Sequence, residues 1–314
     1  MAALTAAVDL SVVVVNWNSR DDLRACLASL RDQRGCALEV IVVDNGSTDG
    51  SADMVAAEFT EARLIRATEN LGFAEGCNRG IAASGGAWVA MLNNDAVAEP
   101  DWARALADAA AGASSDCGML QSLQLFLDRP DVINSTGLEL TRSGGGRDRS
   151  AGRRRSAVDA EAVFCPTAGA AAYRRSALDA VRLSSGWFDR DYFMYLEDFD
   201  LGWRARLAGW DARYVASAVV RHKYKGSAAR RGRSWLVRLS RTNRICTLVK
   251  NASVPFLVAT APRTAAAVVE LLWHGGPSAL VALSQAVRRS LALRAEVSMR
   301  SKRDRRAVER AWVS

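Results

Sequence analysis

The segment Ala87-Trp88-Val89-Ala90-Met91-Leu92-Asn93-Asn94-Asp95-Ala96-Val97 is a short apolar run that stops abruptly on polar side chains. An apolar run of this length between Gly85-Gly86 and Glu99-Pro100 is typical of a strand covered on both faces. Asn93-Asn94-Asp95 then lies at the carboxyl end of that strand, the edge of an α/β sheet at which ligands bind. A carboxylate there can hold a divalent cation, but Asn and Asp are also ordinary turn residues. The segment alone leaves both interpretations open.

Strands and helices alternate along the chain before this segment. Apolar runs predict three strands, and helical spacing predicts the helices that follow them, over 10–15, 20–31, 39–43, 51–59, 62–66 and around Ile81. Four strands that alternate with helices in this way require a parallel sheet with right-handed crossovers. The predicted fold class is therefore α/β.

The first two strands also end on polar side chains at the same edge of the sheet. Asn16 and Asn18 follow the first strand, and Asp44 follows the second. Asp44 is placed to accept a hydrogen bond from a nucleobase or a ribose hydroxyl, although Asp-Asn-Gly is equally a strong turn signal. The chain contains neither Gly-x-Gly-x-x-Gly nor Gly-Lys-Ser/Thr, so a nicotinamide dehydrogenase and a P-loop ATPase are both disfavoured.

The second half of the chain predicts further elements around a variable middle. They are a helix over 101–112 and strands over 117–122, 163–171 and 212–220. The small residues in 163–171 allow a ligand or a neighbouring backbone to approach closely. The span 128–159, rich in Gly, Arg and Ser, predicts a mobile segment with a weak strand near 138–140.

Aromatic rings and carboxylates meet in a second dense stretch. Trp187 and Tyr195 precede the adjacent acids Glu197 and Asp198, and the spacing predicts a helix over 199–208 capped by Asp198. Aromatic rings stack on the apolar face of a sugar, and a carboxylate can take the proton of a hydroxyl group. The alternative is that the two acids only cap the helix and favour its dipole.

The positive charge belongs to the C-terminal third of the chain. Residues 221–314 carry 20 Lys and Arg against 4 Asp and Glu, a balance of +16, whereas residues 1–220 carry −8. Apolar helices with many arginines, over 234–244, 254–273 and 278–293, favour docking on an anionic membrane surface over nucleic acid. A helical appendage packed on the rest of the chain, or a contact between two copies, is the alternative.

The composition excludes several other classes. The 314 residues are 49% hydrophobic and 24% charged, as in ordinary globular proteins. No apolar run reaches about 18 residues, so we expect no membrane-spanning helix, and residues 1–9 lack the parts of a secretory signal. The six cysteines show no Cys-x-x-Cys spacing, which argues against zinc and a disulfide framework and favours reduced thiols in the cytoplasm.

Several motifs together resemble the family 2 inverting glycosyltransferases of the GT-A fold, particularly the bacterial rhamnosyltransferase-like and galactofuranosyltransferase-like members. They are VVVVNWNS (12–19), VVDNGSTDGS (42–51), ENLGFAEGCNRG (69–80), LNNDAV (92–97), FDRDYFMYLEDFDLGWRARLAGW (188–210), His222 and Ser227. Each motif alone is weak, but the ordered set over residues 10–227 is specific. The resemblance implies a mostly parallel GT-A sheet, with a nucleotide-binding half over 1–98, an acceptor-binding half over 99–227 and a basic helical extension over 228–314.

The resemblance also implies roles for individual side chains. The nucleotide pocket is expected to be lined by Asn16, Asn18, Asp44, Asn70, Gly72, Asn78 and Asn94. Asp95 and His222 are expected to bind Mg²⁺ or Mn²⁺, with one departure: Asn93-Asn94-Asp95 replaces Asp-x-Asp, and a single carboxylate holds a metal more weakly. Asp198 is expected to be the general base with Glu197 beside it, and the acceptor is expected to contact Trp187 and Tyr195.

The activity implied is transfer of a sugar from a nucleotide-diphospho-sugar to a glycan or a polyprenyl-diphosphate-linked acceptor. L-rhamnose from dTDP-rhamnose is the first candidate, and galactofuranosyl or another hexosyl transfer is an alternative. We expect a cytoplasmic enzyme, peripheral at the inner face of the membrane, with homo-oligomerisation through the C-terminal helices as an alternative. A nucleotide-sugar-binding pseudoenzyme or assembly protein is the other class considered, and the intact Asp95, Asp198 and His222 argue against it.

Overall fold

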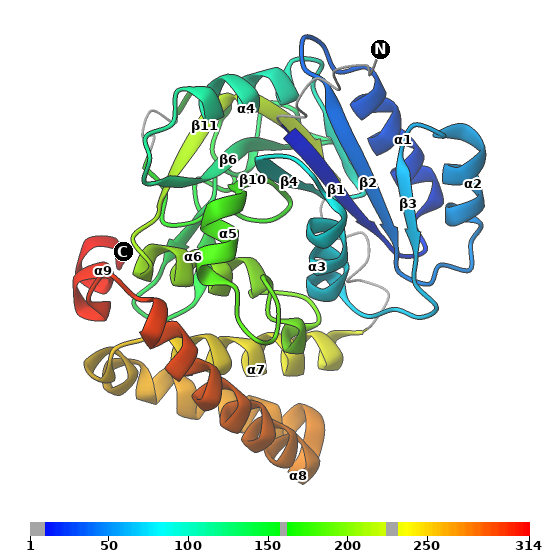
Figure 1. Ribbon diagram of the computed structural model, residues 1–314. Coiled ribbons are helices and arrows are strands. Elements are labelled where there is room, and N and C mark those ends of the chain that lie inside the picture. The colour runs from blue at the N-terminus through cyan, green and yellow to red at the C-terminus, as the bar shows by residue number, and fades with distance from the viewer. Residues whose placement is uncertain (1–9, 158–161, 224–231) are drawn as a thin grey trace.

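The computed structural model describes residues 10–157, 162–223 and 232–314, and its centre is a mixed sheet of nine strands. The first half of this sheet has the order β3-β2-β1-β4 and is parallel throughout (Figure 1). Its elements are β1 (Leu10–Asn16), α1 (Arg20–Arg31), β2 (Leu38–Asp44), α2 (Ser51–Glu58), β3 (Arg63–Arg66), α3 (Phe73–Ala83) and β4 (Trp88–Leu92). The predicted parallel arrangement is confirmed. Residues 1–9, which bear on the secretory-signal prediction, lie outside the described part.

The second half of the sheet mixes strand directions. From β4 it continues in the order β10-β6-β11-β5, with β7 beside β6; only β6 and β11 are parallel neighbours. Its elements are β5 (Ala96–Ala98), α4 (Trp102–Ala111), β6 (Cys117–Phe126), β7 (Ile133–Ser135), β10 (Ala170–Arg174), α5 (Arg175–Val181) and β11 (Asp211–His222). The resulting order brings the ends of β4, β5 and β11 together.

The strand predicted over 163–171 is wrong in its bounds, since β10 begins only at Ala170. The residues before it form a loop whose backbone N–H groups bond to side chains instead of a neighbouring strand. The N–H of Thr167 donates to Gln121 Oε1 at 2.8 Å, and that of Ala168 donates to Asp198 Oδ2 at 3.0 Å. Pro166 has no N–H to offer a ladder, which is why a strand is disfavoured there.

The prediction of a mobile segment over 128–159 is also wrong for its described residues. The strand near 138–140 is confirmed as β8 (Leu138–Leu140), which pairs antiparallel with β9 (Gly146–Asp148). Leu138 and Leu140 are buried in one apolar cluster with Phe199, so the hairpin packs on the body of the molecule. A 3₁₀ turn, η1 (Arg155–Ala157), follows, and residues 158–161 lie outside the described part.

Two layers of helices cover the sheet because alternate side chains of each strand point to opposite faces. Val12 and Val14 belong to a core with α1 and α4, whereas Val13 and Val15 belong to a core with α3. Helix α3 lies very close to β1: a Cβ at Gly76 would be 2.6 Å from the Val15 side chain. That close approach fixes α3, and with it the loop that precedes it, at the sheet edge.

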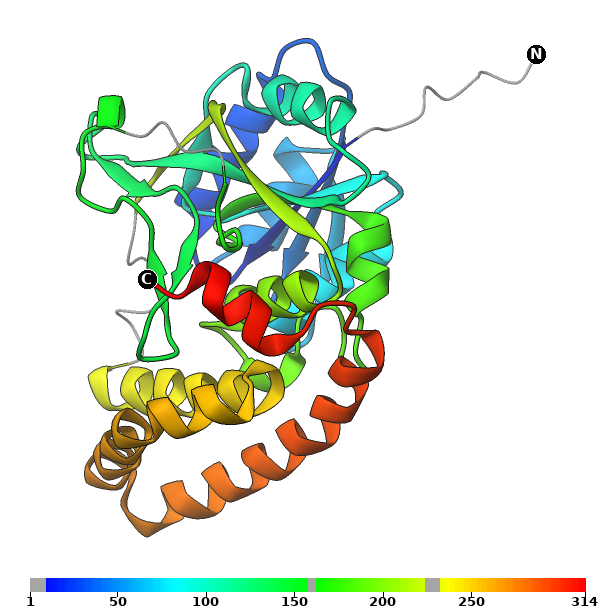
Figure 2. The same ribbon diagram turned by 90° about the vertical axis from the view of Figure 1, so that its left-hand side faces the viewer.

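The C-terminal helices form a layer below the sheet (Figure 2). After η2 (Arg190–Tyr192) come α6 (Glu197–Leu207), β11, α7 (Arg233–Asn251), α8 (Val254–Arg300) and α9 (Arg305–Trp312). Helix α8 is bent at Gly276, as the Gly275-Gly276-Pro277 sequence suggests, and α9 returns to α6. Among the described residues α8 alone is long and apolar enough to cross a membrane by length and composition, a weak indication for a helix that is bent and packed on α7. The expected boundary at 227 and Ser227 itself lie outside the described residues.

Candidate functional site

Polar side chains from three strands meet at the carboxyl edge of the parallel half. Asn94 Nδ2 donates to Asn16 Oδ1 at 2.7 Å, and Asn16 Nδ2 approaches Asp44 Oδ1 at 3.3 Å. The second oxygen of Asp44 accepts from the N–H of Ser47 at 3.0 Å. Asn18 is close by, with its Oδ1 accepting from the N–H of Thr48. The structure therefore brings together four of the side chains expected to bind a nucleotide.

The other three residues of that expected group support the backbone of a neighbouring segment. Gly72 has a φ of +87°, and a Cβ there would lie 2.5 Å from the carbonyl oxygen of Phe193. Asn70 Oδ1 accepts from the N–H of Gly72 at 2.9 Å. Asn78 exchanges two hydrogen bonds with the backbone of Phe188, at 2.8 and 2.9 Å. These residues position the chain ahead of α6, and the amide of Asn78 is already used in doing so.

Asp95 and His222 form a close pair although 127 positions separate them. Pairing of β11 with β5 places His222 opposite Ala96, and His222 Nε2 lies 2.9 Å from Asp95 Oδ1. The other ring nitrogen, Nδ1, lies 3.0 Å from Asn134 Oδ1. Because an amide oxygen can only accept, Nδ1 donates to Asn134, and Nε2 is the ring nitrogen that faces Asp95.

This pair suits a hard cation that keeps other ligands. A ring nitrogen fixed by a hydrogen bond on its far side is the usual arrangement of a metal-binding histidine. Burial raises the pKa of Asp95, but the hydrogen bond and charge of His222 outweigh burial, so the pKa lies below its usual value. The described residues contain no group of three His, Cys, Asp or Glu arranged for a metal. Two protein ligands fit Mg²⁺ or Mn²⁺, since such ions take their remaining ligands from water and substrate phosphates.

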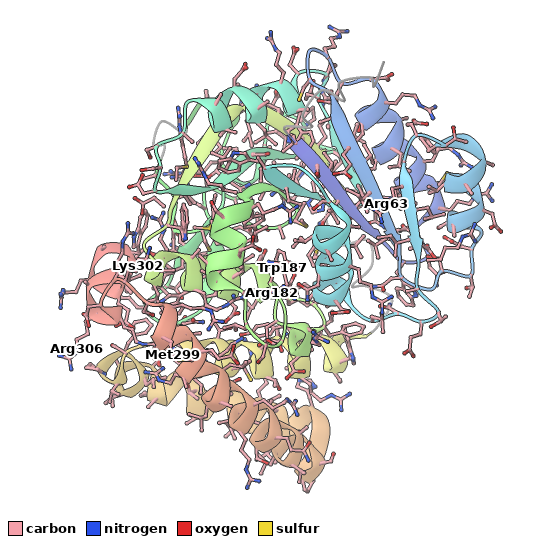
Figure 3. The ribbon with its side chains drawn as sticks, in the orientation of Figure 1. Arg63, Arg182, Trp187, Met299, Lys302 and Arg306 are labelled. Atoms are coloured by element: carbon pink, nitrogen blue, oxygen red, sulfur yellow. The ribbon has the colours of Figure 1, made fainter. Side chains whose placement is uncertain are left out.

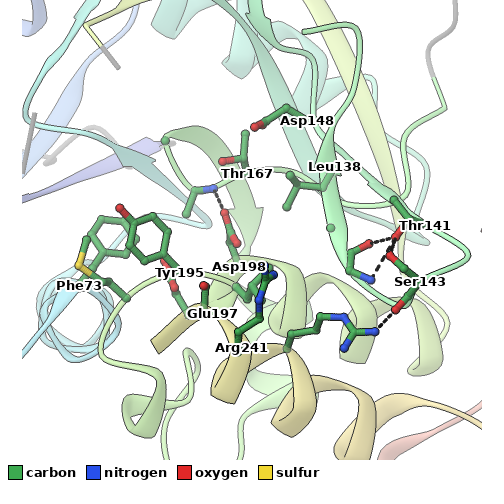
Figure 4. A pocket seen from close by; sticks show the side chains of 18 of the residues that line it. Phe73, Leu138, Thr141, Ser143, Asp148, Thr167, Tyr195, Glu197, Asp198 and Arg241 are labelled. Carbon is green, nitrogen blue, oxygen red and sulfur yellow. Dashed lines mark hydrogen bonds between the residues drawn. The ribbon is translucent and has the colours of Figure 1, made fainter. Parts of the chain in front are cut away.

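A cavity of about 780 Å³ extends from His222 past the carboxylates at the start of α6 (Figure 4). Four residues expected in the site line it: Tyr195, Glu197, Asp198 and His222. Trp187 is not in its wall. The Trp187 ring is buried against Arg182, whose guanidinium carbon lies 4.4 Å from the ring centre, and its Nε1 donates to Asp179 (Figure 3). Trp187 therefore supports the fold beside the site.

Asp198 is fixed in the cavity wall by two backbone donors. Its Oδ2 accepts from the N–H of Ala168 at 3.0 Å and its Oδ1 from the N–H of Phe199 at 2.7 Å. The prediction that Asp198 caps the helix is wrong, because α6 begins at Glu197 with Leu196 at the cap position. Loss of water raises the pKa of Asp198, and the two N–H groups act against that rise. Both donors favour the ionised form.

Glu197 has the opposite environment. It is buried, and its Oε2 has no hydrogen-bond partner in the part of the chain that the structure describes. Burial raises the pKa of Glu197 well above its usual value, and the neighbouring charge of Asp198 raises it further. Adjacent acids with different surroundings divide the roles of proton carrier and carboxylate. Asp198 is thus the member that can act as a base.

Sequence reasoning missed several residues of the cavity. Asp148 faces it from β9, and burial raises the pKa of this carboxyl group (Figure 4). It falls in the span expected to be mobile, but the hairpin signal was present in Gly144-Gly145-Gly146 between alternating strands. Arg241, Arg244 and Arg263 also line the cavity, from α7 and α8. The spacing of residues along a helix cannot show that these arginines line a cavity, because the other walls of the cavity come from elements far away in the sequence.

Comparison with known proteins agrees with this geometry. Residues 11–182 match the model of the family described as glycosyl transferase family 2. The chain is 30% identical over 253 residues to the N-acetylglucosaminyl-diphospho-decaprenol L-rhamnosyltransferase of Mycobacterium tuberculosis, covering 70% of this chain and 78% of that protein.

Solved structures share the fold. The mannosyltransferase PcManGT from Pyrobaculum calidifontis, with GDP-Man and Mn²⁺, has a TM-score of 0.55 and 19% identity, over 98% of this chain and 88% of that one. GalNAc-T7 with UDP, GalNAc and Mn²⁺ has a TM-score of 0.63 and 14% identity, over 93% of this chain and 56% of that one. Identities this low show the fold alone. Together with the family match, they establish that the chain is a glycosyltransferase of the GT-A fold and belongs to glycosyl transferase family 2.

Proposed function

We propose that the enzyme transfers L-rhamnose from dTDP-rhamnose to a sugar on a polyprenyl diphosphate, with inversion of the anomeric configuration. The name of the mycobacterial relative supports this donor and acceptor class. The observation that carries the chemistry is Asp198, a carboxylate held by two backbone N–H groups in the cavity that also contains His222. Galactofuranosyl or another hexosyl transfer uses the same residues and differs in the donor.

Residues 1–98 carry the nucleotide end of the proposed site and residues 99–227 carry the acceptor end. Asn16, Asn18, Asp44 and Asn94 line the base and ribose end. Asn70, Gly72 and Asn78 act indirectly, by fixing the segment before α6.

Asp95 and His222 would hold Mg²⁺ or Mn²⁺, which neutralises charge on the leaving diphosphate when bound. Asp198 removes the proton from the acceptor hydroxyl, and the hydroxyl oxygen attacks the anomeric carbon on the face opposite the diphosphate. The bond from the anomeric carbon to the diphosphate oxygen breaks in the same step, so one displacement inverts the configuration. Tyr195 lies in the cavity wall and offers its ring to the acceptor sugar.

The test uses the full chain with dTDP-rhamnose, Mn²⁺ and an N-acetylglucosaminyl diphosphate carrying an alkyl chain. We expect release of dTDP and a product heavier by one rhamnose, both lost when the metal is chelated. Asp198→Asn should lower kcat by about a hundredfold or more, as expected for loss of a general base, while dTDP-rhamnose still binds. Turnover at the wild-type rate in Asp198→Asn would refute the assignment of the base.

A pseudoenzyme that only binds nucleotide sugars remains the second candidate. It would bind dTDP-rhamnose or another donor but release no nucleoside diphosphate with any acceptor. The paired Asp95 and His222 and the buried acids disfavour it, since carboxyl groups with pKa values shifted by burial cluster at catalytic sites.

Peripheral attachment to an anionic membrane is part of the proposal. Helix α8 exposes Val258, Val269, Trp273 and Val281, with Trp273 84% exposed. The helix stands in a chain segment with an excess of 16 positive charges. Apolar side chains at the surface of a basic helix suit the interface of anionic lipids. These features support a position at the cytoplasmic face of the membrane, where a polyprenyl-linked acceptor would be held.

A further inference from the structure

Three arginines gather at the end of the cavity formed by the C-terminal helices. Arg241 and Arg244 come from α7, and Arg263 comes from α8. Their charges act on one another, because burial and then the charges of Arg241 and Arg263 lower the pKa of Arg244. No carboxylate contributes to that shift. The side chains of this arginine cluster therefore lie together, in a wall that also contains the acids at the start of α6.

The cluster has more positive charge than its surroundings balance. Arg244 is only 8% exposed, and its hydrogen bond goes to the neutral carbonyl oxygen of Ser143. Arg263 makes no hydrogen bond or ion pair with any residue that the structure describes. Arg241 alone has an acid partner, Glu270, at 2.6 Å. A buried guanidinium beside two other cations is costly unless an anion joins it.

A phosphate group matches the chemistry of this cluster. The guanidinium presents planar paired donors that bind phosphate oxygens in a bidentate manner. The alternative is that water alone solvates these guanidinium groups. Water can solvate Arg263, which is exposed, but not Arg244, which is buried. An anionic group of a substrate bound in the cavity would pair with the Arg244 guanidinium.

The cluster lies on the acceptor side of Asp198. His222, Asp148 and Asp198 all line the cavity, and the charge of Asp148 interacts with the charges of both other groups. In Figure 4 Arg241 lies on the side of Asp198 away from Asp148. The donor diphosphate belongs at the His222 end, because that is where the metal pair lies.

We propose that Arg241, Arg244 and Arg263 bind the diphosphate of the lipid-linked acceptor, so that its sugar hydroxyl reaches Asp198. This inference rests on the proposed function. Helix α8 carries Arg263 in the cavity wall and exposes Val269 and Trp273 a few turns later. A hydrocarbon chain leaving the diphosphate would therefore meet an apolar surface.

The experiment compares two acceptors that carry the same sugar and alkyl chain. One is joined through a diphosphate, and the other is a simple alkyl glycoside. The measured quantity is the ratio of kcat/KM for the two acceptors, together with the KM for dTDP-rhamnose. Variants are Arg244→Gln and Arg263→Gln, and Arg288→Gln on the exposed surface of the same helix is the matched control.

We expect the wild type to prefer the diphosphate acceptor, and the ratio to fall about tenfold or more in Arg244→Gln and Arg263→Gln, since charged hydrogen bonds are lost. Arg288→Gln should keep the wild-type ratio. Arg263 is exposed, so Arg263→Gln should fold. It tests the binding of the acceptor diphosphate even if Arg244→Gln, at a buried position, does not fold.

Each of the following results would overturn the inference. Equal use of both acceptors by the wild type, or an unchanged ratio in Arg263→Gln, shows that no acceptor phosphate is bound. A higher KM for dTDP-rhamnose with an unchanged ratio assigns the arginines to the donor diphosphate. Failure of the wild type to release nucleoside diphosphate with either acceptor and any donor refutes the proposed function, and this inference with it. Transfer to the alkyl glycoside alone refutes only the inference.

Discussion

Glu197 and Asp198 are adjacent in the chain, but the fold gives their carboxyl groups different surroundings. Asp198 receives N–H donors from Ala168 and Phe199, which a carboxylate needs when it leaves water. Glu197 Oε2 receives no hydrogen bond from the described residues. The loop before β10 contributes to this difference, because the N–H of Ala168 donates to Asp198. A sequence that contains two acids side by side cannot show which of them is supplied with donors.

Glu197→Gln is expected to raise the melting temperature at neutral pH. Burial raises the pKa of Glu197, so the folded protein keeps a proton that the unfolded chain releases near pH 4.3, about its ordinary value. The stability from this proton is fully present below that value and is lost as the pH rises toward the folded pKa. Gln carries no titrating proton, so the variant avoids this loss of stability. A gain of about 1 kcal/mol in the free energy of unfolding corresponds to a melting temperature higher by roughly 2–4 °C.

Thermal unfolding of both proteins between about pH 4 and pH 8 checks this sign, since the linkage acts only across the window between the two pKa values. The difference in melting temperature should grow with pH and vanish at the acidic end. Asp53→Asn, at an exposed acid of α2, is the control and should show no such trend. A difference that is constant across the range would mean that Glu197 is ionised in the folded protein.

Side chains that end strands could be placed from the sequence, whereas side chains on distant helices could not. Asn16 and Asp44 are register partners in β1 and β2, so their proximity follows from strand order alone. The position of His222 beside Asp95 depends on β11 pairing with β5, a pairing that no local pattern specifies. Arg244 is one of many arginines in a basic segment, and only the packing of α7 distinguishes it.

Among the elements, the segment between η2 and α6 is under backbone strain. Phe193, Tyr195 and Leu196 all have positive φ, of 60°, 69° and 67°, although none is glycine. Such conformations cost about 1–3 kcal/mol each and persist only where neighbours hold them. Asn243 of α7 supplies one restraint, since its amide donates to the carbonyls of Tyr192, Met194 and Tyr195 at 2.9–3.0 Å. The strain therefore lies directly before Glu197 and Asp198.

Gly72→Ala is expected to displace this segment and lower kcat by about tenfold or more, since misplacement by about 1 Å has effects of this order. The new Cβ would lie 2.5 Å from Phe193 O, and the φ of +87° disfavours any side chain. Steady-state kinetics measures the change in kcat, and urea unfolding separately measures the change in the free energy of unfolding.

Gly152→Ala is the matched control for that variant. Gly152 has a similar φ of +80°, but a Cβ there meets no atom within 4 Å. The Gly152→Ala variant should be less stable only because its positive φ disfavours a side chain, and it should keep its activity. If Gly72→Ala behaves in the same way, the contact with Phe193 has no part in positioning the acids.

Elements with local signals were predicted closely, and elements fixed by tertiary contacts were not. The 10–15 run became β1 because a β-branched apolar run suits a buried parallel strand in any context. The 163–171 run has an equally apolar sequence but is a loop until Ala170, because its N–H groups bond to Gln121 and Asp198. The hairpin of β8 and β9 lies in a Gly- and Arg-rich span whose composition hides two short strands.

For the molecule as a whole, a buried ion cluster joins α7 to α6 and the segment before it. Lys250 of α7 is fully buried and lies 2.5 Å from Asp189 and 3.1 Å from Asp200. Asp200 also pairs with Arg204 at 2.9 Å. We expect Lys250→Met to destabilise the protein by about 3–5 kcal/mol, because buried Asp189 loses its cation and Asp200 keeps only Arg204.

Urea unfolding followed by circular dichroism and by tryptophan fluorescence measures this loss. Lys302→Met, at an exposed lysine, is the control and should change the stability little. Both probes should report one coincident transition in the wild type, since the cluster couples α7 to α6. Two separate transitions would mean that residues 228–314 form an independent domain. If Lys250→Met then destabilised only one of the two transitions, the coupling between α7 and α6 would be contradicted.

The bend of α8 is the part of the molecule best suited to a lipid surface. Trp273 is 84% exposed and Val269 66% exposed, both shortly before the bend at Gly276 (Figure 2). We expect the protein to sediment with vesicles that contain anionic lipid, and less with neutral vesicles or in high salt, because screening weakens attraction to the charged surface. The double variant Val269→Ser, Trp273→Ser should lose most of this binding.

Val254→Ser is the control, because Val254 is 65% exposed but lies at the start of α8, where Ser253 is bonded to Glu309 of α9. It should bind vesicles as the wild type does, since only the bend is expected to enter the interface. Equal loss in both variants would show a general effect of removing apolar area. A dimer in solution that the double variant converts to monomer would show that the bend contacts a second copy. In that case the arginine cluster would still line the cavity, but the acceptor's hydrocarbon would have to leave between two subunits.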